Sequence, residues 1–75
     1  MSIIVTGKIE RQGFGSGTWA LVTPEGKTYE LKDPPPQLCR AITAVKVVGV
    51  IREDVMTLAM IGPVLEVKTF DILMQ

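Results

Sequence analysis

The sequence predicts an all-β (mainly β) protein, a small closed barrel of five to six strands with one short helix. Apolar residues recur at every second position through most of the chain, which is the spacing of strands with one face in a core. A run of three prolines interrupts this pattern, because proline cannot donate a hydrogen bond to a sheet. The chain has 75 residues, so we expect a single domain over residues 1–75.

The first strand is predicted over residues 3–11, where Ile3, Val5 and Ile9 alternate with polar residues. Its central segment "VTGKI" shares the pattern V-x-G-x-I with "VVGVI" at residues 47–51. Glycine weakens a strand unless the strand bends sharply or another backbone comes close. Central glycines in both strands therefore favour a sheet that curls and closes on itself.

A hairpin is predicted next, with strands over residues 18–23 and 28–32. The turn "TPEG" joins them, because Pro24 fixes the first turn position and Gly26 is free to adopt a positive φ. The residues predicted to share one face of this hairpin are Trp19, Leu21, Tyr29 and Leu31.

The segment "DPPPQLCRAI", residues 33–42, predicts one or two helical turns. Asp33 is placed to cap a helix, and proline is favoured at the first helical position. The spacing i, i+3, i+4 predicts one apolar face made by Leu38, Ala41 and Ile42.

The remaining strands are predicted over residues 45–52 and 64–73, with a short strand over residues 57–61 before the "GP" break. The apolar positions of the last strand change from odd to even numbers part-way along it. One extra residue in the strand would reconcile the two sets of positions, so we expect a β-bulge near Thr69.

This order, with the helix between strands 3 and 4, is that of the OB-fold, a five-stranded Greek-key barrel. The segments "GTWALVTPEGKTYEL" and "VKVVGVIREDVMTLAMIGPVLEV" resemble a family of small bacterial OB-fold-like proteins of unknown function. The resemblance covers most of the chain and implies an OB-like Greek-key barrel, but it implies no catalytic residue. An SH3-like barrel is the alternative fold, and it lacks a natural place for residues 33–42.

Charge and cysteine content narrow the functional classes. Eight Lys and Arg residues balance eight Asp and Glu residues, so the net charge does not draw the molecule toward nucleic acid or an anionic membrane. Cys39 is the only cysteine, which excludes an internal disulfide and is typical of a reducing compartment. The opening "MSIIVTGK" lacks the basic region and the length of a signal sequence, so we expect a soluble cytoplasmic protein.

The sequence offers little for catalysis. It has no histidine, Cys39 has no obvious base nearby in sequence, and no metal-ligand spacing is present. We therefore expect no enzymatic activity, no cofactor and no metal. The glycines of "RQGFGSGTW" precede a strand instead of a helix, so this segment predicts a flexible hairpin loop and not a phosphate-binding loop.

Two binding functions follow from these patterns. Aromatic and basic residues near the hairpin suit single-stranded nucleic acid, with Lys32 at the border of the same face. The candidate ligand contacts are Arg11, Phe14, Gly15, Trp19, Lys27 and Tyr29. The alternative interpretation places Trp19 and Tyr29 in the core, because they share parity with Leu21 and Leu31.

Protein contacts are the favoured function. Val22, Val48 and Val50 lie on the face opposite the predicted core, and Met56, Met60 and Ile61 cluster later in the chain. Exposed apolar patches mark interfaces, and methionine adapts to irregular contacts. We expect a non-enzymatic binding or accessory module that contacts a protein partner or a second copy of the chain.

Overall fold

The computed structural model describes residues 2–12, 18–54 and 61–73, and it is mainly β. In chain order the elements are β1 (Ser2–Gln12), β2 (Thr18–Val22), β3 (Thr28–Lys32), α1 (Pro36–Cys39), β4 (Val45–Arg52) and β5 (Val64–Ile72). The short helix lies between β3 and β4, as the sequence predicts. The short strand predicted over residues 57–61 falls outside the described residues except for Ile61, which lies in a bend.

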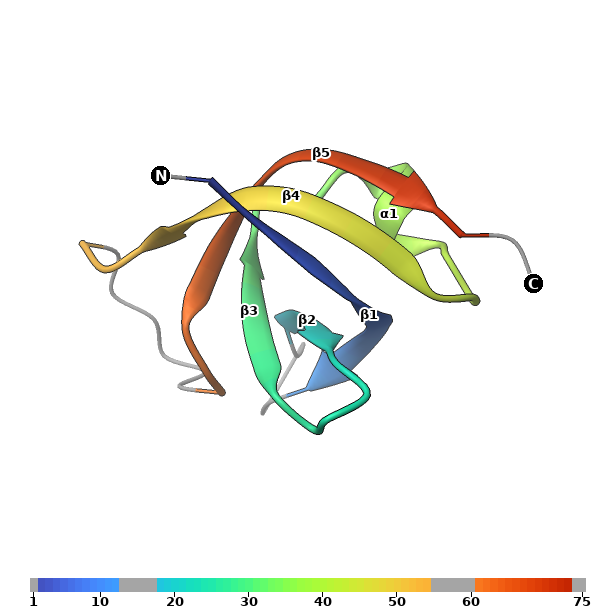
Figure 1. Cartoon of the computed structure of the whole chain (residues 1–75), viewed down its shortest axis with the longest axis horizontal. Helices are drawn as coiled ribbons and strands as arrows, with labels where there is room; N and C mark the ends of the chain where they lie inside the picture. The colour runs from blue at the N-terminus through green and yellow to red at the C-terminus, as the bar shows by residue number, and fades with distance from the viewer. Residues whose placement is uncertain (1, 13–17, 55–60, 74–75) are drawn as a thin grey trace.

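The sheet closes into a barrel in the order β1-β2-β3-β5-β4, and β4 pairs back to β1 (Figure 1). β1 has two partners: residues 2–7 pair with β4, and residues 8–12 pair with β2. The β3–β5 pairing is parallel, and the other four are antiparallel. The length of β1 is therefore what allows it to join both halves of the barrel.

Two glycines permit this closure. Gly7 lies where β1 exchanges β4 for β2, and a Cβ added there would collide with the carbonyl group of Val22. Gly49 is the matching glycine of β4, and a Cβ there would collide with the carbonyl oxygen of Glu66. The shared V-x-G-x-I pattern thus marks two places where another backbone comes close, which is one of the two reasons that the sequence offers for glycine in a strand.

The predicted bulge in the last strand is confirmed. Val48 of β4 is paired with Thr69, whereas the next residue, Gly49, is paired with Val67. Lys68 is therefore the extra residue of β5. The bulge bends β5 and reconciles the change of parity among its apolar side chains.

The core fills the inside of the barrel. The buried cluster consists of Val5, Leu21, Tyr29, Leu31, Leu38, Val45, Val47 and Leu65. Every strand contributes to it, and α1 contributes Leu38, which is fully buried. Trp19 and Ala41 are among the partly buried residues that pack against the cluster.

The helix differs from the prediction in two ways. It spans only four residues, its N-cap is Pro35 and no side chain caps it, so Asp33 is not the cap. Asp33 instead has a positive φ of 51° and pairs with Lys32. Ile42 is 93% exposed, because the helix ends at Cys39 and the i+4 spacing no longer places Ile42 with Leu38.

Candidate functional site

The sequence-predicted contacts fall into two groups. Phe14, Gly15 and the rest of loop 13–17 lie outside the described residues, as do Met56 and Met60. The structure describes the other four predicted contacts, and it brings them together as two pairs, Arg11 with Trp19 and Lys27 with Tyr29.

Arg11 and Trp19 lie directly opposite each other on β1 and β2. The guanidinium carbon of Arg11 is 5.0 Å from the centroid of the Trp19 ring, within the range of a cation–π contact. Arg11 is exposed, whereas Trp19 is half-buried and packs against the core cluster. The indole therefore has a structural role on one side and reaches the surface on the other.

Lys27 and Tyr29 form the second pair, with the Lys27 ammonium 5.2 Å from the centroid of the Tyr29 ring. Tyr29 is only 8% exposed and belongs to the core cluster, opposite Leu21 in the β2–β3 register. The face that Trp19 and Tyr29 share is thus the inner face of the barrel. Neither ring stands free on an outer surface of the hairpin.

The Lys27–Tyr29 pair borders an open end of the barrel. A hollow of about 570 Å³ lies there, and the strands β1, β3, β4 and β5 all contribute to its wall. Its lining residues are Ile3, Lys27, Tyr29, Ile51, Arg52, Glu53, Gly62, Pro63 and Val64. We call this hollow the barrel mouth.

A second hollow of about 390 Å³ adjoins the mouth. It lies between the first half of β1 and the β2–β3 turn, and it is lined partly by Ile4, Thr23 and Pro24. Lys27 and Tyr29 line both hollows. The pair therefore stands between two open spaces, which the sequence pattern of the hairpin alone did not reveal.

Sequence reasoning missed the aliphatic wall of the mouth. Ile3 and Ile51 lie on the inner faces of their strands, but both are only half-buried because they lie near strand ends. Inward-facing positions at the ends of several strands are the one signal that could have indicated an open mouth. That signal requires knowing which strand ends meet.

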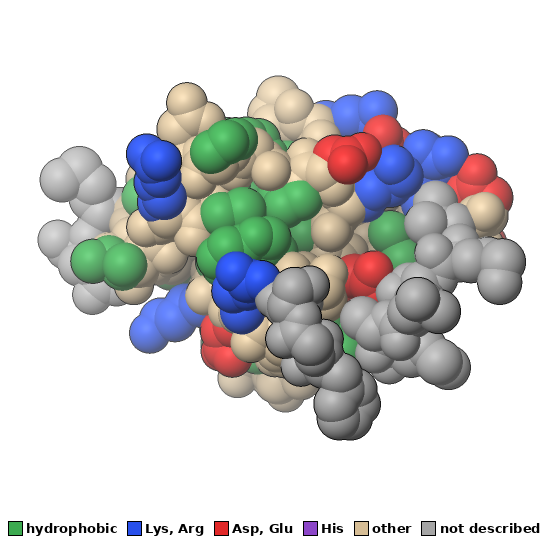
Figure 2. All heavy atoms as spheres, turned by 180° about the vertical axis from the view of Figure 1, so that it is seen from behind, with side chains coloured by type: hydrophobic (Ala, Val, Ile, Leu, Met, Phe, Trp, Pro, Cys, Tyr) green, Lys and Arg blue, Asp and Glu red, His purple; other side chains and the backbone are tan. Residues whose placement is uncertain are grey.

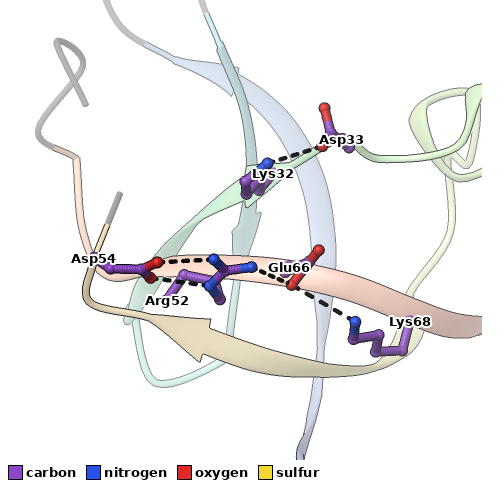
Figure 3. Close-up of polar contacts among 6 residues, drawn as sticks. All are labelled: Lys32, Asp33, Arg52, Asp54, Glu66 and Lys68. Atoms are coloured by element: carbon purple, nitrogen blue, oxygen red, sulfur yellow. Dashed lines mark hydrogen bonds and ion pairs between the residues drawn. The ribbon is translucent and has the colours of Figure 1, made fainter. Parts of the chain in front are cut away.

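An ion-pair cluster joins the end of β4 to β5 (Figure 3). Arg52 donates from Nε and Nη2 to the two carboxylate oxygens of Asp54, at 3.0 and 2.8 Å, and from Nη1 to Glu66 at 2.8 Å. Lys68 lies 3.6 Å from the same Glu66 oxygen. Three of the five N–H groups of Arg52 are therefore engaged within the protein.

These contacts shift the acidity of both carboxyl groups. The hydrogen bonds from Arg52 lower the pKa of Asp54 to about 2 and also lower the pKa of Glu66. The same carboxylates raise the pKa of Arg52. Arg52, Asp54 and Glu66 are therefore charged at neutral pH, and their ion pairs connect the end of β4 to β5.

The outer face of the β1–β4 pair carries apolar side chains. Ile4 is 67% exposed and lies opposite Val48, while Val48 and Val50 are half-buried. We call these three residues the outer strip. Hydrophobic side chains also gather near the centre of the face seen from behind, beside Lys or Arg side chains (Figure 2).

Cys39 is a half-buried free cysteine. Burial raises the pKa of its thiol, and the positive charge of Arg11 opposes this only in part. The thiol is therefore protonated at neutral pH. Within residues 2–12, 18–54 and 61–73, no three His, Cys, Asp or Glu side chains gather closely enough to hold a metal ion.

Comparisons with known proteins identify no relative of this chain. No protein-family model, curated protein or solved structure matches the chain. In the part of the chain that the structure describes, no helix is both long and apolar enough to cross a membrane.

Proposed function

We propose that the protein is an OB-like Greek-key barrel that acts as a non-enzymatic binding module through protein contacts. Support for the OB-like topology comes from the strand order β1-β2-β3-β5-β4, the long β1 shared by both halves, and the helix between β3 and β4. Such barrels present ligand surfaces on a rigid scaffold, which suits a binding role.

The observation that carries the proposal is the outer strip. Ile4 is two-thirds exposed near the start of β1, and the neighbouring strand β4 presents Val48 on the same face. An exposed apolar surface on regular, paired strands is preorganised for contact, because little side-chain or backbone ordering remains to be done.

A second copy of the chain is the partner we propose. Eight positive and eight negative side chains give zero net charge, so two copies approach without long-range repulsion. The two outer strips would then meet around a two-fold axis, which is the commonest symmetry of homodimers.

Sedimentation velocity tests this proposal over a concentration series of the wild-type protein and two variants. We expect the wild-type protein to associate and Ile4→Lys to remain monomeric. Ile42→Lys is the matched control, because Ile42 is also exposed but lies outside the outer strip. A wild-type protein that stays monomeric up to about 1 mM would exclude a dimer contact worth more than about 4 kcal/mol.

The Arg11–Trp19 pair favours a second candidate function, binding of single-stranded nucleic acid. A half-exposed indole beside a guanidinium is suited to stacking with a base and contacting a phosphate. The zero net charge and the burial of Tyr29 weigh against it.

Titration of the protein with short single-stranded DNA and RNA, followed by Trp19 fluorescence, tests this second function. A saturable change that weakens steeply with salt would support it, because phosphate contacts release counterions. Arg11→Gln is the test variant and Lys46→Gln the charge-matched control. Absence of any saturable change at low salt would rule the function out.

A further inference from the structure

We propose that the barrel mouth binds a small apolar molecule that carries one carboxylate group. Its volume of about 570 Å³ falls within the range of roughly 300–1,000 Å³ that is typical of small-molecule sites. This ligand site is separate from the outer strip, none of whose three residues lines the mouth. The proposal therefore does not depend on self-association.

The apolar part of the ligand is matched by an aliphatic wall. Ile3, Ile51 and Val64 come from β1, β4 and β5, so their positions are fixed by the paired strands of the barrel. The Tyr29 ring from β3 completes this apolar surface. A wall built on four strands is rigid, and apolar binding then costs little ordering.

The chain segment beside this wall is also held in place. The backbone N–H of Glu30 donates to the carbonyl oxygen of Pro63 at 2.8 Å, which ties the segment entering β5 to β3. A Cβ at Gly62 would collide with the carbonyl oxygen of Thr28, so the two backbones are in close contact. The mouth therefore has fixed sides next to Tyr29.

Two residues that line the mouth carry hydrogen-bond donors for a carboxylate, the Lys27 ammonium and the Tyr29 hydroxyl. The Lys27 ammonium forms no ion pair with any carboxylate of the described residues. The Tyr29 hydroxyl has no hydrogen-bond partner among the described residues, and none of their buried polar side-chain atoms lacks a partner, so this hydroxyl reaches solvent. An ammonium and a hydroxyl donor beside an apolar wall suit one carboxylate.

The other charged groups of the mouth select a single negative charge. Arg52 is already engaged by Asp54 and Glu66, so Lys27 is left as the principal cation for the ligand. Glu53 lines the same mouth and is exposed. A second negative charge on the ligand would be repelled by Glu53 without gaining a second free cation, which disfavours a phosphate.

The test is an NMR titration of the isotope-labelled full chain with 2-naphthylacetate and with its neutral analogue, 2-naphthylacetamide. Both probes offer the same apolar body, and only the first carries a carboxylate. We expect saturable shifts of the backbone amide signals of Lys27, Tyr29 and Gly62 with both probes. The carboxylate should bind more tightly by up to about fivefold, which is the range of an exposed ion pair.

Lys27→Met should bring the affinity ratio of the two probes to about one while the amide probe still binds. Lys8→Met is the matched control, since Lys8 is an exposed lysine that does not line the mouth. Tyr29→Phe keeps the ring and should weaken both probes, the carboxylate more than the amide, because both offer an oxygen that accepts from the hydroxyl. The proposal is overturned by shifts that map elsewhere, by the absence of saturable shifts, or by a ratio that Lys27→Met leaves unchanged.

Discussion

Replacing Leu38 with alanine should destabilise the protein more than its place in a four-residue helix suggests. Leu38 is 0% accessible to solvent, and its side chain packs within the buried cluster. Alanine removes three carbon atoms, each worth about 0.8 kcal/mol of transfer free energy, which gives about 2.4 kcal/mol. The cavity adds to this loss, so we expect a total near 3 kcal/mol.

This loss is large for a chain of this size. At about 0.05–0.15 kcal/mol per residue, the expected free energy of unfolding is roughly 4–11 kcal/mol. Leu38→Ala would therefore remove between a quarter and three quarters of it. The variant should still fold in water at 25 °C, which makes the free energy of unfolding measurable.

Urea unfolding followed by Trp19 fluorescence provides the assay, because Trp19 is the only tryptophan and packs against the core cluster. With a slope of about 1–3 kcal/mol per molar urea, the midpoint should fall by about 1–3 M. Ile42→Ala is the control and should change the free energy of unfolding by less than about 0.5 kcal/mol. A Leu38→Ala loss no larger than that of the control would refute the placement of Leu38 in the core.

Three further predictions concern the backbone and the ion pairs. Gly7→Ala should lower the free energy of unfolding by at least about 2 kcal/mol, because its Cβ meets the Val22 carbonyl group. Gly26→Ala should lower it by about 1 kcal/mol, because only the φ of 91° opposes a side chain there. Thermal melts would rank the two variants, and equal losses would contradict the steric argument. The lowered pKa of Glu66 stabilises the fold above its ordinary pKa of 4.5, and this stabilisation is lost as pH falls through the folded value. Urea unfolding at about pH 7 and about pH 3 should therefore show a smaller acid loss for Glu66→Gln than for wild type, and a steeper loss would contradict this sign. Arg52 and Glu66 share one hydrogen bond, so Glu66→Gln should lower the free energy of unfolding at about pH 7 by less in an Arg52→Gln background than in wild type. Equal losses in the two backgrounds would argue against coupling between the two side chains.

The sequence determined the strands β1 to β5, the hairpin turn, the place of the helix and the bulge near Thr69. These features depend on local chemistry: alternating side chains, proline and glycine at turn positions, and a change of parity within one strand. The paired glycines indicated either a sharp bend or a close backbone contact, because glycine otherwise weakens a strand.

The tertiary structure decided where the helix ends, which strands close the barrel and what surrounds each candidate residue. Asp33 and Ile42 fit a longer helix by spacing, but the helix has only four residues, of which Leu38 is the buried one. The burial of Tyr29, the engagement of Arg52 and the barrel mouth all depend on strand ends that are far apart in the chain. Such contacts follow from long-range closure of the sheet, and no local pattern of residues specifies them.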